Sequence, residues 1–125
     1  MIKQITSLVV QGKGQASTFD VPTANLEIGD QLDKEGVYVV TIQKEDKTFQ
    51  GVSYFGKAWL LEGAPQRIEV HLFDYEGPAF YGDNITVEFL KYLREPMKFA
   101  SEEEAKIQIQ KDIQEARDLF KTINN

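Results

Sequence analysis

Cysteine is absent from this chain of 125 residues, and histidine and tryptophan each occur once. Without a thiol there can be no disulfide, no thiolate nucleophile and no thiolate-ligated zinc or iron–sulfur site. A single imidazole with no serine or cysteine motif beside it does not make a nucleophilic triad. No run approaches the roughly 18–20 apolar residues of a membrane-spanning helix. These absences remove thiol chemistry and triad hydrolysis from the candidate functions, and we expect no membrane partner.

Positive charge is also scarce. Fourteen basic residues face twenty acidic ones, for a net charge of -6. Because non-specific binding to nucleic acid or to an anionic membrane needs a basic face, we expect neither as a partner. A phosphate-bearing ligand stays compatible, since a bound divalent cation supplies positive charge locally. The N-terminus lacks the sustained apolar stretch of a signal peptide, so we expect a cytoplasmic protein.

Most of the chain alternates between apolar and polar residues, as β-strands do. The pattern is clearest over Gly36–Lys44, and Glu45-Asp46 predicts a hairpin turn into the next strand. Several strands at such close spacing favour a small antiparallel barrel or sandwich. The predicted strands are Ile5–Gln11, Asn25–Ile28, Gly36–Lys44, Thr48–Phe55, Arg67–Phe73 and Asn84–Tyr92.

The C-terminal part changes to a helical period. Ser101 followed by Glu104 is a capping box, and we expect a helix from about Glu102 to Thr122. Asp112 borders its apolar stripe rather than the opposite, solvent-facing side. The stripe, which should pack on the strands, consists of Ala105, Ile109, Ile113, Ala116, Phe120 and Ile123.

A glycine loop and a polar segment near the N-terminus are suited to a nucleotide and its metal. The glycines of Gly12-Lys13-Gly14 let backbone amides approach an anion. Thr23 and Asn25 are two residues apart, so their side chains point the same way in an extended segment and can offer oxygen ligands to magnesium. A polar surface loop with a proline turn is the simpler interpretation. The loop is not a Walker A motif.

A second polar group falls on a predicted strand. Glu69 and His71 share one face of it, and a carboxylate at a partly closed barrel mouth can accept a proton from a hydroxyl. A solvent-facing polar row is the alternative. Arg94 can clamp a ligand, although an ion pair with a carboxylate of the helix is the simpler prediction. Aromatic residues crowd the second half of the chain and can stack on a planar ligand, but more often they fill a core.

Taken together and in order, these motifs resemble the riboflavin kinase family, meaning the kinase module of bacterial bifunctional FAD synthetases and the stand-alone flavokinases. The resemblance covers nearly the whole chain, and Pro22–Asn25 is its most specific element. The matching residues are Gly12, Gly14, Pro22–Asn25, Gly36-Val37-Tyr38, Glu69–His71, Asp74, Tyr81-Gly82, Leu93-Arg94, Lys98-Phe99, Gln108-Ile109 and Asp112.

The resemblance implies a mostly β fold, a six-stranded antiparallel, Greek-key-like barrel with a C-terminal helix packed on it. We expect one domain over residues 1–125, with the barrel at about 1–98 and the helix at about 101–122. The resemblance also implies transfer of the γ-phosphoryl group of ATP to the ribityl 5′-hydroxyl of riboflavin, which gives FMN and ADP.

Roles for single residues follow from the same resemblance. Thr23 and Asn25 would hold magnesium or a similar divalent cation between the ATP phosphates, with Gly12, Lys13 and Gly14 covering the nucleotide. Glu69 would be the catalytic base that takes the hydroxyl proton. The residues expected to lie against the flavin are Arg94, Phe99 and Asp112.

Departures from the family pattern motivate the alternatives. Gln15 stands where the family usually has a basic residue, and Asp20 where it usually has a glycine. The first alternative is therefore a non-catalytic flavin- or nucleotide-binding module, and the second is a barrel that only binds proteins. The chain leaves no room for an adenylyltransferase module, so we expect FMN and not FAD as product. We expect a monomer, because one barrel and one helix face account for the apolar residues.

Overall fold

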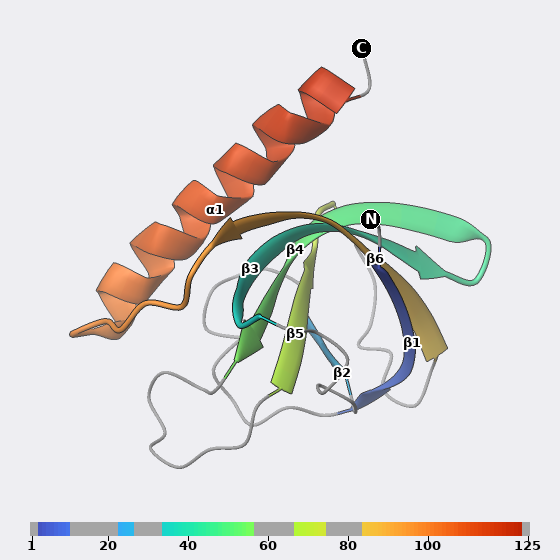
Figure 1. Cartoon of the computed structure of the whole chain (residues 1–125), viewed down its shortest axis with the longest axis horizontal. Helices are drawn as coiled ribbons and strands as arrows, with labels where there is room; N and C mark the ends of the chain where they lie inside the picture. Colours follow the sequence, from blue (N-terminus) through green and yellow to red (C-terminus); the bar gives the residue numbers. More distant parts are fainter. Residues whose placement is uncertain (1–2, 11–22, 27–33, 57–66, 75–83, 124–125) are drawn as a thin grey trace.

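The computed structural model describes residues 3–10, 23–26, 34–56, 67–74 and 84–123. The prediction of a mostly β, antiparallel fold with a C-terminal helix is confirmed (Figure 1). Among the described residues no helix is long and apolar enough to cross a membrane. The elements in chain order are β1 (Lys3–Val10), β2 (Thr23–Leu26), β3 (Gly36–Lys44), β4 (Lys47–Gly56), β5 (Arg67–Leu72), β6 (Asn84–Arg94) and α1 (Glu102–Ile123).

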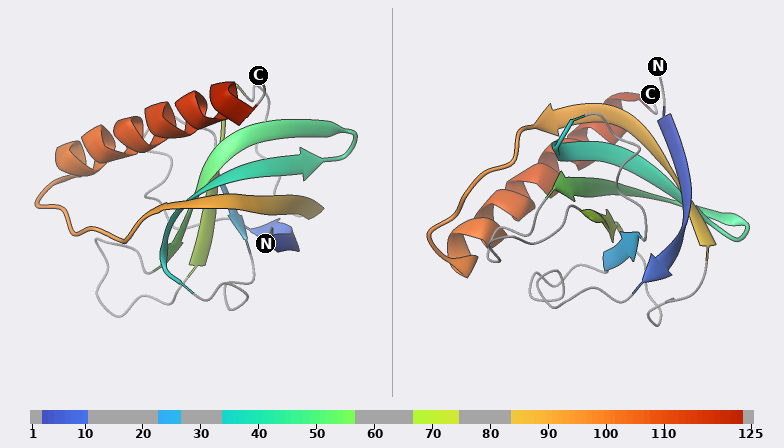
Figure 2. Two further views of the ribbon diagram at one scale, coloured as in Figure 1. Left: turned by 45° about the horizontal axis from the view of Figure 1, so that its top comes forward. Right: turned by 60° about the horizontal axis from the view of Figure 1, so that its bottom comes forward.

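The strands are not arranged in chain order. They pair in the order β1-β2-β5-β4-β3-β6, and β1 pairs in turn with β6, which closes the sheet into a barrel (Figure 2). Every pairing is antiparallel. Because β5 lies between β2 and β4, it connects an early segment of the chain to the middle of the sheet. The order thus brings the segment after the glycine loop beside the strand that carries Glu69.

The barrel interior is a closed apolar cluster to which all six strands contribute. Along β3 the predicted alternation is confirmed, since Val40 and Ile42 are fully buried inside while Val37 and Val39 face the other way. Burial of such side chains stabilises the fold by about 1.5–3 kcal/mol each. The interior residues are Ile5, Leu26, Val40, Ile42, Phe55, Ile68, Val70, Leu72, Ile85, Val87 and Phe89.

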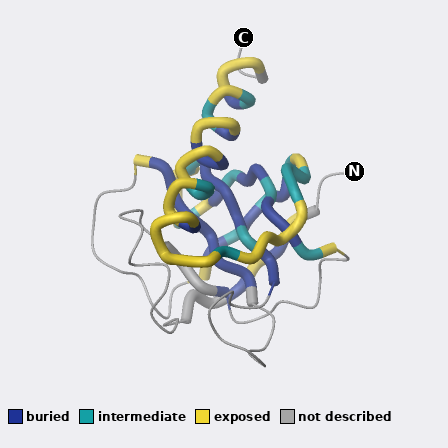
Figure 3. Tube along the Cα trace, turned by 90° about the vertical axis from the view of Figure 1, so that its left-hand side faces the viewer, coloured by how far each residue is buried: buried dark blue, intermediate teal, exposed yellow. Residues whose placement is uncertain are grey.

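Helix α1 packs on the outside of the barrel, against apolar residues of β3, β4 and β6. In Figure 3 exposed positions of the helix, drawn in yellow, alternate with buried and intermediate ones. The Ser101 half of its predicted capping box is present, because the Glu104 N–H donates to the Ser101 hydroxyl at 3.2 Å. Its predicted stripe faces the strands from Ala105 to Phe120, with Ala105 and Ala116 fully buried. A second apolar cluster therefore joins helix and sheet. Its buried members are Val37, Val39, Val52, Phe73, Ile113, Ala116 and Phe120.

Strands β4 and β5 approach each other closely at Gly51. A Cβ at this position would lie 2.2 Å from the main-chain oxygen of His71, so no larger residue fits without displacing a strand. The β3–β4 hairpin turns at Glu45, whose φ of 57° confirms the predicted turn. The close contact at Gly51 fixes β5, and with it the polar residues described next, against the centre of the sheet.

Candidate active site beneath the helix

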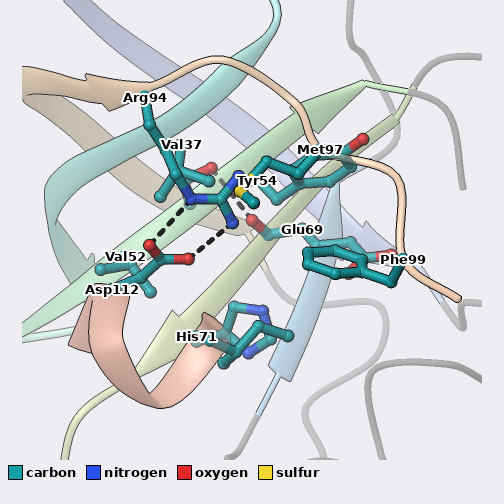
Figure 4. A pocket seen from close by; sticks show the side chains of 11 residues that line it. Val37, Val52, Tyr54, Glu69, His71, Arg94, Met97, Phe99 and Asp112 are labelled. Atoms are coloured by element: carbon teal, nitrogen blue, oxygen red, sulfur yellow. Dashed lines mark hydrogen bonds and ion pairs between the residues drawn. The ribbon is translucent and has the colours of Figure 1, made fainter. Parts of the chain in front are cut away.

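A cavity of about 50 Å³ lies between the outer face of the sheet and the N-terminal half of α1 (Figure 4). Strands β3, β4 and β5 form one wall, with Val37 and Val52 on it. The segment between β6 and α1 closes one side with Met97 and Phe99. The polar side chains that line the cavity are Ser53, Tyr54, Glu69, His71, Arg94 and Asp112.

Glu69 and His71 are both buried, with 8% and 4% of their surface exposed. Their neighbours Ile68, Val70 and Leu72 fill the barrel interior, so the two polar residues lie on the outer face of β5. The alternative of a solvent-facing row is therefore wrong, because α1 covers this face. The expected position at the barrel mouth is wrong for the same reason. Two-residue alternation excludes Glu69 from the interior.

Burial lowers the pKa of His71 from 6.5 to about 4, while the negative charge of Asp112 opposes this shift. The imidazole is therefore neutral at pH 7, and in that form it has one donor and one acceptor nitrogen. A neutral histidine adds no positive charge to the cavity. Among the described residues that line the cavity, Arg94 is the one that carries a positive charge.

Arg94, the last residue of β6, forms the predicted ion pair with the helix. Its Nε donates to Asp112 Oδ1 at 2.9 Å and its Nη2 to Asp112 Oδ2 at 2.7 Å. The Gln108 amide donates to the same Oδ1 at 3.1 Å, and Arg94 Nη1 donates to the main-chain oxygen of Glu95 at 2.9 Å. Such a two-point pair is stronger and more directional than a single charge contact. It ties the end of the barrel to the middle of α1.

The structure brings together segments that are far apart in the sequence. In the register of β2 with β5, Asn25 lies opposite Glu69 and Thr23 lies opposite His71. The main chain therefore places these two segments side by side. The predicted nucleotide-loop residues Gly12, Lys13 and Gly14 lie outside the described residues, and so do Gln15 and Asp20.

The remaining predicted residues surround one cavity. Arg94, Phe99 and Asp112 line it together with Glu69. Sequence reasoning missed Met97 and Tyr54. Tyr54 was detectable in principle, since it shares a face of β4 with buried Val52. Met97 gave no signal, because no period governs the segment between β6 and α1.

The arrangement provides the buried carboxylate of Glu69 beside the guanidinium of Arg94, which Asp112 holds in place, in a cavity with an apolar wall. A carboxylate in such a place can accept a proton from a hydroxyl. Among the described residues, no three histidine, aspartate or glutamate side chains converge to hold a metal. A threonine hydroxyl and an asparagine amide oxygen are donors of the kind that a hard divalent cation accepts.

Known proteins resemble this chain along most of its length. A sequence model of the riboflavin kinase family matches residues 3–120. The chain is 36% identical over 119 residues to a bifunctional riboflavin kinase/FMN adenylyltransferase of Haemophilus influenzae, a match that covers 94% of the chain and 38% of that protein. The protein of the same name from Bacillus subtilis is 33% identical over 124 residues, a match that covers 95% of this chain and 39% of that protein. The chain thus spans well under half the length of these relatives.

Two solved structures share the fold. A crystal structure of a macrolide-efflux protein from Streptococcus pneumoniae superposes with a TM-score of 0.74 at 30% identity, over 87% of this chain and 36% of that one. The crystal structure of riboflavin kinase from Trypanosoma brucei gives a TM-score of 0.66 at 19% identity, over 96% of this chain and 80% of that one. At this lower identity, the second likeness shows the fold alone.

Proposed function

Because this chain belongs to the riboflavin kinase family, we propose that it transfers the γ-phosphoryl group of ATP to the ribityl 5′-hydroxyl of riboflavin. The products are FMN and ADP. The observation that carries the proposal is the register between β2 and β5, in which Asn25 and Thr23 lie opposite Glu69 and His71. The proposed cation-binding segment and the proposed base are thereby adjacent in space.

Glu69 acts as the general base in this proposal. Its carboxylate accepts the proton of the 5′-hydroxyl as that oxygen forms a bond to the γ-phosphorus. The bond between the γ-phosphorus and the bridging oxygen to the β-phosphate breaks, and ADP leaves. Burial of Glu69, at 8% exposed, supports the role, because a site that excludes water strengthens electrostatic contacts and prevents hydrolysis of ATP.

Thr23 and Asn25 hold a divalent cation, for which magnesium is the expected ion. A hydroxyl and an amide oxygen fit the preference of this ion for oxygen ligands. When bound, the cation neutralises charge on the ATP phosphates. We keep Gly12, Lys13 and Gly14 as the residues that cover the nucleotide.

The flavin occupies the region of the cavity beneath α1, near Arg94 and Phe99. A cavity of about 50 Å³ has room for no more than a few water molecules. Flavin entry therefore requires its walls to separate. The segment between β6 and α1 is the wall best suited to move, because it has no helix or strand structure and Met97 is 43% exposed.

We also propose that residues 1–125 act as one domain, a six-stranded Greek-key-like barrel with its helix, working as a cytoplasmic monomer. The absence of cysteine fits a reducing compartment. Among the described residues only two large apolar side chains are exposed, Met97 and Ile107, so these residues offer little apolar surface to a partner. Sedimentation as a dimer at micromolar concentration would contradict the monomer.

The test is formation of FMN from riboflavin, ATP and magnesium, followed by chromatography. Glu69→Gln should lower turnover about a hundredfold or more while leaving the fold intact, because the amide cannot take the proton. Glu88→Gln is the matched control, since Glu88 is also on a strand but bonds Gln4 at the surface. Normal turnover by Glu69→Gln would remove Glu69 from this role. Riboflavin binding without FMN formation by the unmodified protein would favour the non-catalytic alternative.

A further inference from the structure

Arg94 has hydrogen-bond donors to spare. A guanidinium carries five N–H groups, one on Nε and two on each terminal nitrogen. Nε and one N–H of Nη2 are used by Asp112, and one N–H of Nη1 is used by the oxygen of Glu95. Among the described residues there is no further acceptor for Arg94. One N–H on Nη1 and one on Nη2 therefore remain.

Asp112, in contrast, is almost fully engaged. Its side chain is 7% exposed, and its two oxygens accept from Arg94 at two points and from Gln108 at a third. A carboxylate offers about four acceptor sites, so little capacity remains for a ligand. In Figure 4, Asp112 lies on one side of the guanidinium, while Glu69 and Tyr54 lie on the other. The edge that Asp112 leaves uncovered faces the cavity.

The surroundings of this pair differ from those of an ordinary surface ion pair. Helix α1 makes a second contact of the same chemical type, in which Arg117 Nη2 lies 3.4 Å from Asp74 Oδ1. That pair has one short contact, and its side chains are 41% and 81% exposed. The Arg94–Asp112 pair has two contacts, and its side chains are 20% and 7% exposed. The Arg94–Asp112 pair, with two contacts and less exposure, is therefore the one suited to fix the direction of a guanidinium.

We propose that Asp112 is a positioning residue that acts through Arg94. Asp112, itself held by Gln108, fixes the plane of the guanidinium so that the free N–H groups of Nη1 and Nη2 meet acceptor atoms of the flavin together. Asp112 thus makes no essential contact with the flavin, in contrast to its expected role as a flavin-binding residue. The inference rests on the proposed riboflavin kinase function.

The test compares riboflavin affinity with ATP affinity. Asp112→Asn keeps the shape of the side chain but places an amide donor against the guanidinium, which breaks the two-point contact. We expect the Kd for riboflavin, from fluorescence quenching, and the KM for riboflavin each to rise about tenfold. The KM for ATP should stay within about twofold. A merely structural role predicts equal changes for both substrates, or a lower melting temperature alone, and either result would overturn the proposal.

Two further variants complete the design. Asp74→Asn removes the other pair at a residue with a φ of 60°, a conformation that asparagine adopts as readily as aspartate, and should leave the riboflavin Kd unchanged. Gln108→Leu removes one of the three bonds to Asp112 and should raise the riboflavin Kd about two- to threefold. If Asp112→Asn does not fold, the riboflavin Kd of Gln108→Leu decides whether the proposal stands. An unmodified protein that binds riboflavin but makes no FMN contradicts the proposed function while leaving these Kd comparisons intact.

Discussion

The two ends of the interface between α1 and the sheet differ in chemistry. The C-terminal end is apolar, where Phe73 and Phe120 meet edge to face with ring centroids 6.5 Å apart and Ala116 is fully buried. The N-terminal end buries Glu69, His71 and Asp112 around a cavity. Burial of apolar groups stabilises the fold, whereas burial of polar groups costs free energy unless they are paired. The helix is therefore held mainly at one end and carries the candidate site at the other.

This division separates stability from function along a single helix. A residue at the apolar end should change the free energy of unfolding without changing substrate affinity for the folded protein. A residue at the polar end should change substrate affinity without changing the free energy of unfolding, or should make that free energy depend on pH. Three measurements test this separation.

The largest effect is expected for Phe120→Ala. Removing a large core side chain that is 4% exposed should lower the free energy of unfolding by about 3–5 kcal/mol. Urea unfolding followed by circular dichroism measures the loss. Ile107→Ala, at a helix position that is 53% exposed, is the control and should change stability by no more than about 0.5 kcal/mol. Equal losses for both variants would show that the apolar end does not hold the helix.

The second effect concerns acid. The pKa of His71 is about 4 in the folded protein and 6.5 in the unfolded chain. Between these values the unfolded chain binds a proton that the folded protein does not, so stability falls as the pH falls from 6.5 to 4. Over this pH range the free energy of unfolding falls by about 3 kcal/mol at most because of His71.

Urea unfolding of the unmodified protein and of His71→Gln, each at pH 7 and pH 4.5, checks the acid prediction. The other groups that titrate in this range are common to both proteins, so their effect cancels in the comparison. That variant should lose less stability on acidification than the unmodified protein, by about 2–3 kcal/mol. An identical loss in both would mean that His71 is not responsible for acid sensitivity at the polar end.

The smallest effect is expected for the surface ion pair at the apolar end. Asp74→Asn should change the free energy of unfolding by less than about 1 kcal/mol, because an exposed pair gains little over its contacts with water. The guanidinium of Arg117 also lies 4.5 Å from the centroid of the Phe73 ring, and this contact remains in the variant. Thermal unfolding at low and high salt measures the change. A loss as large as that of Phe120→Ala would contradict the view that apolar burial dominates this end.

Local patterns in the sequence predicted the elements well. The bounds of β3 were predicted as Gly36–Lys44, and α1 extends one residue beyond the predicted Thr122. Both have strong periods and clear stop signals, so neighbouring residues alone determine them. Strand β6 was predicted to end at Tyr92 but continues to Arg94, where it pairs with Val37 across a register shift. Such an irregularity breaks the two-residue period and hides the end of the strand.

The surroundings of the site residues were harder to predict. The spacing of Glu69 and His71 placed them on one face of a strand, but period alone cannot tell a face covered by a helix from one exposed to water. The pairing of β2 with β5 depends on the order of strands in the sheet, which no local signal encodes. An ion pair of Arg94 with a carboxylate of the helix was predicted, and Asp112 was separately predicted to border the apolar stripe. The structure shows that Asp112 is the partner of Arg94.

Helix α1 follows all six strands in the chain and supplies one wall of the cavity, through Asp112 and Ile109. During synthesis on the ribosome, the strands therefore emerge before the cavity can exist. Until the helix docks, the outer faces of β3 and β4 expose Val37, Val39 and Val52 to water. Until then the proposed flavin site lacks one wall, and the exposed apolar faces make the nascent chain prone to aggregation.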